Sequence, residues 1–168
     1  MPKIRELDKV EADYPLSGAN HTVLRQPMPV SSDVLFNCLA DGAAWKEWLG
    51  IGVEWTSPEP RGEGTTRTVT GNGQRMEEWF FTWEPGSHFS FRFDRATLPL
   101  KAFAEHYRCE STGPSTSDLV WSYSYEWGGP LKALMGPAFG AFFRFNCKRG
   151  LKKLTKLLAT QGDRWAAA

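Results

Sequence analysis

The chain has 168 residues, of which 41% are hydrophobic and 23% are charged. These proportions are typical of a globular protein, and the length suits one domain better than two. Twenty basic residues nearly balance nineteen acidic ones, to a formal net charge of +1. Such a chain has no overall field that would attract a phosphate backbone, so we expect no nucleic acid among its partners.

The sequence also lacks the patterns that are typical of membrane-spanning segments and of metal sites. No apolar run reaches the roughly 18 residues that span a bilayer, and residues 1–13 lack the apolar stretch of a signal peptide. We therefore expect a cytoplasmic protein without integral membrane association. Cys38, Cys109 and Cys147 are far apart, without the close spacing of metal ligands, so we expect buried, reduced thiols, no metal and no cofactor.

Aromatic residues are unusually frequent, at 14% of the chain, with eight Trp and eleven Phe. Large rings bury much area but pack stiffly, so this many in a small domain suggest a curved sheet around a concave space. The aromatic content therefore suggests an internal pocket, with a solid aromatic core as the alternative that it leaves open.

The first predicted elements are a strand and two short helices. Residues 1–19 are polar and predict a loosely attached N-terminal segment, and a β-prone run over residues 20–28 predicts the first strand of a domain. Ser31 or Ser32 can cap a short helix. A second short helix follows, in which the spacing of Trp45 and Trp48 presses both indoles onto one surface.

After Gly50 the hydrophobic period changes to that of strands. Gly71-Asn72-Gly73 supplies the positive-φ residues that a tight hairpin needs. Phe89, Phe91 and Phe93 alternate with polar residues, which predicts an antiparallel strand with one wet face. The strands expected in this meander cover residues 53–56, 65–70, 74–83, 87–94, 101–110 and 118–127.

The last of these strands carries a row of rings. Trp121, Tyr123, Tyr125 and Trp127 share one face of it, because successive side chains of a strand point to opposite sides. Four rings in a row are too many for a solvent-exposed face. We expect this face to turn toward the interior.

A long amphipathic helix is predicted at the C-terminal end. A short helical turn over residues 131–135 precedes Gly136-Pro137, where we expect the long helix to begin, since proline suits a first turn. Its opposite face carries a basic stripe, which indicates either a surface for a membrane or an acidic partner, or an ordinary solvated face favoured by the helix dipole. The second interpretation is preferred. The stripe consists of Arg144, Lys148, Lys152 and Lys156.

The order of elements predicts an α+β fold in which a curved antiparallel sheet wraps around a long C-terminal helix, with two short helices after the first strand. The domain is expected over residues 20–162, with a tail at 163–168. The chain resembles the START-like helix-grip (SRPBCC) superfamily, in the branch of polyketide cyclase/dehydrase and lipid transport proteins. The resemblance rests on the joint order of Pro29-x-x-x-Asp33-Val34-Leu35-Phe36, Asp41-x-x-x-Trp45-x-x-Trp48, Gly62-x-Gly64-Thr65-x-Arg67, the hairpin leading into Glu78, Trp83-Glu84-Pro85-Gly86, Val120-Trp121 and the terminal helix.

The resemblance implies a pocket for a small hydrophobic or aromatic molecule, lipid-like or polyketide-like, and it implies no particular reaction. The phenols of Tyr123 and Tyr125 and the amide of Asn146 need partners when buried, which a ligand or the protein could supply. The residues expected to contact the ligand are Phe89, Phe91, Phe93, Tyr107, Trp121, Tyr123, Tyr125, Phe139, Phe143 and Asn146.

Catalytic candidates depend on which way the strand over residues 101–110 faces. If Phe103 and Tyr107 point inward, Glu105 points inward with them and becomes a carboxyl group in an apolar pocket, with a raised pKa. In the opposite register His106 is the candidate base. Glu78, Arg67, Arg92 and Tyr123 are further candidates, and the sequence leaves the register open.

Three functions remain open on the sequence. The first is a binder of a small hydrophobic ligand, and the second is a cyclase or dehydratase acting on such a ligand, for which Glu105 or His106 must project into the cavity beside a tyrosine or arginine. The third is a protein-interaction module that uses the basic helix face or exposed Trp45 and Trp48, with a filled interior. The sequence indicates no oligomeric state.

Overall fold

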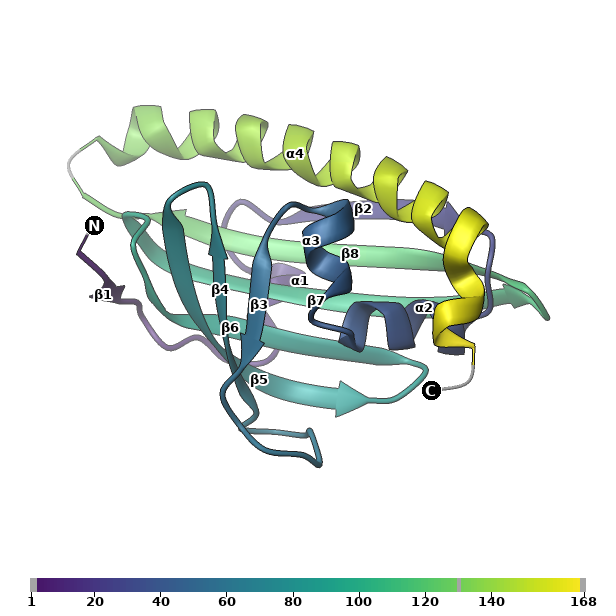
Figure 1. The fold of residues 1–168 in the computed structure, drawn as a ribbon. Helices are drawn as coiled ribbons and strands as arrows, with labels where there is room; N and C mark the ends of the chain where they lie inside the picture. Colours follow the sequence, from purple (N-terminus) through teal and green to yellow (C-terminus); the bar gives the residue numbers. More distant parts are fainter. Residues whose placement is uncertain (1–2, 130, 167–168) are drawn as a thin grey trace.

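The computed structural model describes residues 3–129 and 131–166. A strongly bent sheet forms one layer, and a long helix runs across its concave side (Figure 1). The strands are β1 (Arg5–Glu6), β2 (Thr22–Met28), β3 (Gly52–Trp55), β4 (Thr66–Gly71), β5 (Gln74–Glu84), β6 (His88–Ala96), β7 (Leu100–Gly113) and β8 (Thr116–Trp127). The helices are α1 (Tyr14–Ser17), α2 (Ser32–Ala40), α3 (Ala44–Trp48), α4 (Lys132–Gln161) and the 3-10 helix η1 (Gly162–Trp165).

The sheet confirms the predicted helix-grip layout. Its strand order is β2-β8-β7-β6-β5-β4-β3, so the strands from β3 to β8 form a meander and the first long strand, β2, pairs with the last. All of these pairs are antiparallel. The β7–β8 hairpin is longer than expected: pairing continues to Gly113 and Thr116, where the sequence predicted a polar turn over residues 111–117.

Aromatic side chains cover the concave face of the sheet, as their period-two spacing predicts. Phe89, Phe91 and Phe93 are all buried, and so are Trp121, Tyr123 and Tyr125 on β8. Neighbouring rings stack across the strands: the centroid of Phe93 lies 4.4 Å from that of Phe103, and the centroid of Tyr107 lies 4.9 Å from that of Trp121. Each ring pair adds stabilisation beyond its buried area.

The two short helices close one end of the bent sheet. Ser31 caps α2, since its hydroxyl oxygen accepts a hydrogen bond from the backbone N–H of Val34 at 3.4 Å. In α3 the indole of Trp45 donates to the carbonyl oxygen of Leu39 at 2.8 Å, and Trp45 and Trp48 are each 1% exposed. The interaction-module hypothesis was wrong in treating these two indoles as surface residues.

Helix α4 is continuous, and the expected break before Gly136-Pro137 was wrong. The helix begins at Lys132 and Pro137 lies inside it. Proline removes the hydrogen bond to the carbonyl of Ala133 four residues earlier, but Ala133 is exposed, so water can satisfy that oxygen. On the inner side the phenol of Tyr125 donates to the carbonyl oxygen of Gly136 at 2.8 Å, which ties this turn to β8.

Both ends of the described chain pack against the domain instead of trailing from it. β1 pairs with β6, and α1 lies behind the sheet against β7 and β8 (Figure 1). At the other end Trp165 is buried, and its indole donates to Asp41 Oδ2 at 3.0 Å. Residues 3–19, the described part of the N-terminal segment, are therefore attached to the domain. Residues 1–2 and 167–168 lie outside the described residues.

Candidate functional site

A cavity of about 750 Å³ lies between the sheet and α4. Helix α4 forms one wall with Phe139, Phe143 and Cys147, and the strands β6, β7 and β8 form the opposite wall. Trp45 and Trp48 close one end, as expected from their spacing. A space of this size matches the pockets that proteins use for small-molecule ligands.

Six of the ten expected ligand contacts line this cavity. They are Phe93, Tyr107, Trp121, Phe139, Phe143 and Asn146. The other four, Phe89, Phe91, Tyr123 and Tyr125, are packed among other side chains outside its wall. The ring of Phe89, for example, stacks between those of Trp83 and Tyr107, at centroid distances of 5.3 and 5.0 Å.

The structure decides the register of β7. Glu105 and Tyr107 point to the concave side and line the cavity. His106 points to the opposite side, where its ring lies 5.4 Å from that of His88, and burial lowers its pKa to about 4. Glu105 is therefore the acid/base candidate inside the cavity, and His106 is outside it. Tyr123 packs edge-on against Phe143, with the ring centroids 4.9 Å apart.

A polar cluster stands among these rings. Arg67 on β4, Glu78 on β5 and Glu105 on β7 all line the cavity and are all at least 95% buried. The Nε of Arg67 donates to Oε2 of Glu78, and the phenol of Tyr107 donates to Oε2 of Glu105 at 2.8 Å. Neighbouring strands bring these side chains to one face, because β4, β5, β6 and β7 pair in sequence.

Aromatic faces surround the guanidinium of Arg67. Its Cζ lies 4.7 Å from the ring centroid of Trp45, 4.8 Å from that of Phe91 and 5.1 Å from that of Phe80. Ring faces carry partial negative charge and attract a cation most strongly where water is excluded. The rings and Glu78 together explain how a charged arginine can be held in the interior.

The two carboxyl groups of the cluster differ in environment. Burial raises the pKa of Glu105 to about 8, and the nearby charge of Glu78 adds to this effect. Burial also raises the pKa of Glu78, but the adjacent Arg67 opposes that change. At neutral pH Glu105 is therefore mainly a neutral acid that can donate a hydrogen bond, beside an arginine–carboxylate pair.

Three buried donors in the cavity wall have no hydrogen-bond acceptor among the described residues. They are Nη1 of Arg67, Nε1 of Trp48 and Nε1 of Trp121. A buried donor without a partner destabilises a protein by roughly 1–3 kcal/mol. Their position beside an internal space means that an oxygen atom of a bound molecule could accept from them.

The mouth of the cavity includes residues that the sequence did not single out. Arg149 and Lys153 come from α4, and Asn72 and Gln74 come from the β4–β5 hairpin. The apolar wall also contains residues outside the aromatic rows, from β4, from β5 and from the loops that follow α3 and β6. These are Leu49, Ile51, Val69, Met76 and Leu98.

Metal binding and membrane crossing find no structural basis in the part of the chain that the structure describes. No group of three or more His, Cys, Asp or Glu side chains is placed to hold a metal ion there. No helix in residues 3–129 and 131–166 is both long and apolar enough to cross a membrane.

Solved structures share this fold. A START superfamily protein from Mycobacterium smegmatis superposes with a TM-score of 0.67 at 12% identity, over 82% of this chain and 98% of the other. The Zhui aromatase/cyclase from Streptomyces sp. R1128 gives 0.67 at 11% identity, over 89% and 96%. A protein from Thermus thermophilus gives 0.69 at 17% identity, over 84% and 99%. At these identities the similarity establishes the fold alone.

Curated relatives and a family model complete the comparison. Uncharacterized proteins of Mycobacterium tuberculosis and Mycobacterium bovis are 38% identical over 109 residues, which is 62% of this chain and about two thirds, 65%, of theirs. The family model described as polyketide cyclase / dehydrase and lipid transport matches residues 21–159, nearly the whole domain. The chain therefore belongs to this polyketide cyclase/dehydrase and lipid transport family, with the START-like helix-grip fold.

Proposed function

We propose that the protein binds one small hydrophobic or aromatic molecule between α4 and the sheet, with a neutral oxygen of that molecule at the Arg67–Glu105 cluster. The cavity of about 750 Å³, lined by rings and containing three buried donors without acceptors, carries this proposal. Apolar walls supply affinity, and a few fixed polar groups supply orientation. The family to which the chain belongs contains lipid transport proteins and cyclases, which agrees with such a ligand.

The charge of the cluster favours a carbonyl or hydroxyl group over a carboxylate. Glu78 already compensates the charge of Arg67, and Glu105 is mainly neutral at pH 7. A ligand carboxylate would add an uncompensated negative charge in a dry interior, which is strongly unfavourable. A ketone oxygen needs no charge compensation and can accept from Nη1 of Arg67.

Fluorescence titration with N-phenylnaphthylamine, a neutral apolar probe, tests the binding. We expect saturable one-to-one uptake. Met76 is a partly buried strand residue in the cavity wall, so Met76→Trp fills part of the space and should weaken binding about tenfold, or roughly 1.4 kcal/mol. Val23→Trp places the same ring on an exposed position of β2 and is the matched control. Absence of saturation, or equal affinity in the Met76→Trp variant, would refute the proposal.

Glu105 provides an observation in favour of a second candidate, an enzyme that eliminates water from a bound β-hydroxy ketone. A ketone oxygen held by Arg67 would acidify the adjacent C–H, whose proton would pass to the carboxylate of Glu78. The C–O bond would then break, and the hydroxyl would leave as water with the proton of Glu105, leaving a C=C bond. A carboxylic acid that is still protonated at pH 7 suits the last of these steps.

Mass spectrometry of a long-chain β-hydroxy ketone incubated with the protein tests this second candidate. Loss of water should occur with the unaltered protein and fall at least about a hundredfold with Glu105→Gln, the usual effect of losing a general acid. His106→Gln, on the opposite side of β7, is the control and should leave the rate unchanged. No dehydration, or dehydration by Glu105→Gln at the original rate, would leave the protein as a binder alone.

A further inference from the structure

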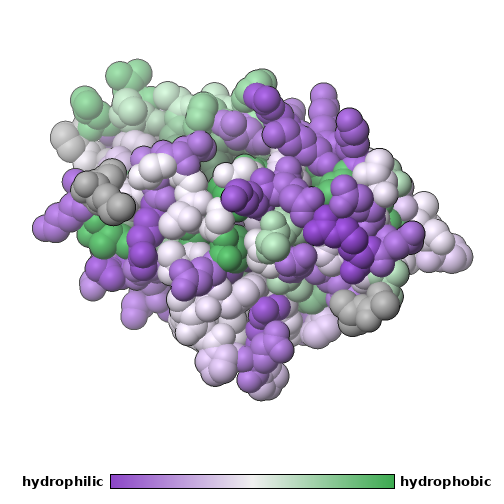
Figure 2. All heavy atoms as spheres, in the orientation of Figure 1, coloured by the Kyte–Doolittle hydropathy of each residue, from purple (hydrophilic) through white to green (hydrophobic). Residues whose placement is uncertain are grey.

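The outer face of α4 is divided along its length. Over the first half of the helix and its N-cap, large apolar side chains are turned to solvent, where Figure 2 shows a hydrophobic patch. Leu134, Phe142 and Phe145 are 69%, 65% and 64% exposed. Leu131 and Met135 continue the patch. Exposed apolar residues are common singly, but five on one helix face indicate a contact surface.

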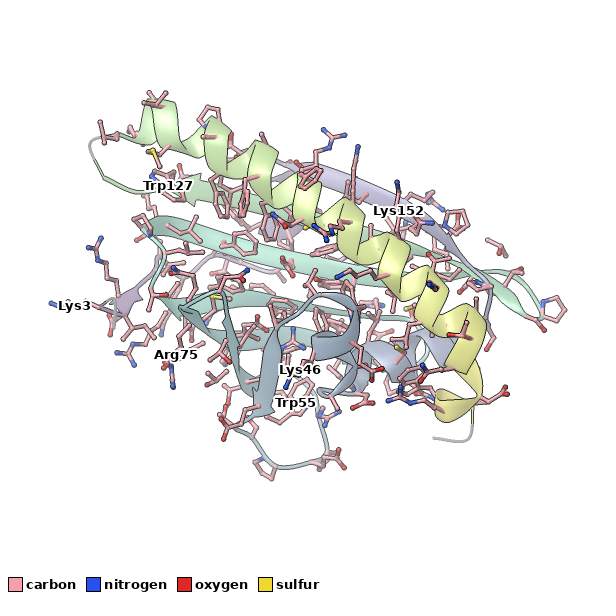
Figure 3. The ribbon with its side chains drawn as sticks, turned by 45° about the horizontal axis from the view of Figure 1, so that its top comes forward. Lys3, Lys46, Trp55, Arg75, Trp127 and Lys152 are labelled. Atoms are coloured by element: carbon pink, nitrogen blue, oxygen red, sulfur yellow. The ribbon has the colours of Figure 1, made fainter. Side chains whose placement is uncertain are left out.

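The second half of the same face is basic. Residues 132–161 contain no Asp or Glu, and their cations are concentrated between residues 144 and 156. Lys152 extends away from the sheet in this half, whereas Trp127 lies beneath the first half (Figure 3). No carboxylate of the described residues forms an ion pair with any of these cations, which are Arg144, Lys148, Arg149, Lys152, Lys153 and Lys156.

An anionic lipid surface matches both halves of this face. Apolar side chains enter the boundary between headgroups and acyl chains, while lysines and arginines lie over the anionic headgroups. A second copy of the chain could cover the apolar half, but its own α4 would offer no anion to the basic half. The charge complementarity therefore favours a membrane over pairing of α4 with the α4 of a second copy.

The cavity opens beside this surface. Phe142 belongs both to the exposed patch and to the cavity wall, and Arg149 and Lys153 belong both to the basic half and to the mouth. A lipid surface in contact with α4 would therefore lie against the entrance. An apolar molecule could then pass between the membrane and the cavity without crossing much water.

We propose that the outer face of α4 docks the protein peripherally on membranes that contain anionic lipids, with the mouth of the cavity toward the bilayer. This interpretation replaces the solvated helix face that the sequence favoured. It goes beyond ligand binding, since docking uses the exposed face of α4 and not the interior.

Vesicle flotation tests the proposal with liposomes of phosphatidylcholine alone and of equal parts phosphatidylcholine and phosphatidylglycerol. We expect binding to the mixed vesicles that weakens as salt increases. Lys148→Glu with Lys152→Glu should lower the partition coefficient at least about thirtyfold, since each lysine near an anionic surface contributes about a factor of five. Lys3→Glu with Lys9→Glu makes the same change of charge on exposed residues far along the chain from α4 and should have little effect.

The apolar half is tested by Leu134→Ser with Phe145→Ser, both exposed and both outside the cavity wall. We expect about a tenfold loss of vesicle binding, with probe uptake in the absence of vesicles unchanged. Leu16→Ser with Val23→Ser, at exposed positions elsewhere, is the control. Vesicle binding that is absent, or equal in all variants, would overturn the proposal. Self-association lost in the Leu134→Ser/Phe145→Ser variant without any vesicle binding would overturn it in favour of a dimer.

Discussion

Arg67 on β4 stands directly opposite Glu78 on β5, and the two side chains form an ion pair in which they are 1% and 3% exposed. A buried ion pair often contributes little net stability, because removing two charges from water costs about as much free energy as their attraction supplies. Removal of one partner, however, leaves an uncompensated charge. Each partner is therefore needed to keep the other charged group in the aromatic interior.

Arg67→Met should lower the free energy of unfolding by about 3–5 kcal/mol, because Glu78 then loses its partner. Urea denaturation followed by circular dichroism measures this. Arg67→Met combined with Glu78→Gln should recover part of the loss. Arg95→Met, which removes a half-exposed pair with Glu77 on the same sheet, should cost at most about 1 kcal/mol. A double variant as unstable as Arg67→Met would contradict this account.

Glu105 should make stability depend on pH. Its pKa is about 8 in the folded protein and lies near 4.5 in an exposed chain, so the folded state holds a proton that the unfolded state releases. Its contribution is fully present below the unfolded pKa, and stability falls as pH rises through 8, by at most about 1.4 kcal/mol per pH unit.

Unfolding measured from pH 6.5 to pH 8 isolates this group from His106, whose low pKa affects stability mainly below that window. The Glu105→Gln variant should show a smaller fall with pH than the original protein. Equal slopes for the two proteins would mean that Glu105 is already ionised at pH 6.5.

Gly140 allows α4 to approach β8 closely. A Cβ atom at this position would overlap the phenol oxygen of Tyr125. Gly140→Ala should therefore destabilise the protein by about 1–3 kcal/mol, although alanine is the better helix former. Tyr125→Phe loses its hydrogen bond to Gly136 and should cost about 1 kcal/mol. Tyr125→Phe also removes the oxygen that the Cβ atom of Gly140→Ala would overlap, so the double variant should be more stable than the sum of the two separate losses predicts. Losses that simply add would contradict this contact.

Trp165 should be a stabilising residue although it lies near the end of the chain. It is buried, its carbonyl oxygen accepts from Asn37 at 3.0 Å, and its indole donates to Asp41. Trp165→Ala should lower the free energy of unfolding by about 3 kcal/mol. Leu16→Ala, at an exposed position, should change it by less than about 0.5 kcal/mol. Equal losses of unfolding free energy in the two variants would mean that Trp165 does not stabilise the domain.

Strand periodicity predicted the fold well and the site only in part. The alternation over Phe89, Phe91 and Phe93 predicted which face is buried, and the structure confirms it. The register of β7 stayed open because both of its faces are buried: Ala104 is wholly covered, on the side where α1 and the N-terminal segment pack. The alternation of side chains along a strand shows which face is buried only when the other face is exposed to solvent.

The same limit explains the ligand contacts. Spacing places Phe89 and Phe93 on one face, yet Phe89 packs against Trp83 and Phe36 while Phe93 lines the cavity. Which rings line the cavity depends on where α2 and α4 cover the sheet. The local sequence pattern of a strand carries no information on how these helices are placed. The meeting of Arg67, Glu78 and Glu105 from three strands is a tertiary relationship of the same kind.

The charged and polar residues of the cavity make its interior and its rim chemically different. Arg67, Glu78 and Glu105 are almost wholly buried, whereas Arg149, Lys153 and Asn72 mark the rim. If the protein binds an elongated ketone as proposed, the ketone end would have to enter first, because the buried donors without acceptors lie in the interior and not at the rim. The hydrocarbon end would then lie nearest the rim, so the rim would limit the length of the ligand while the interior recognises its polar group.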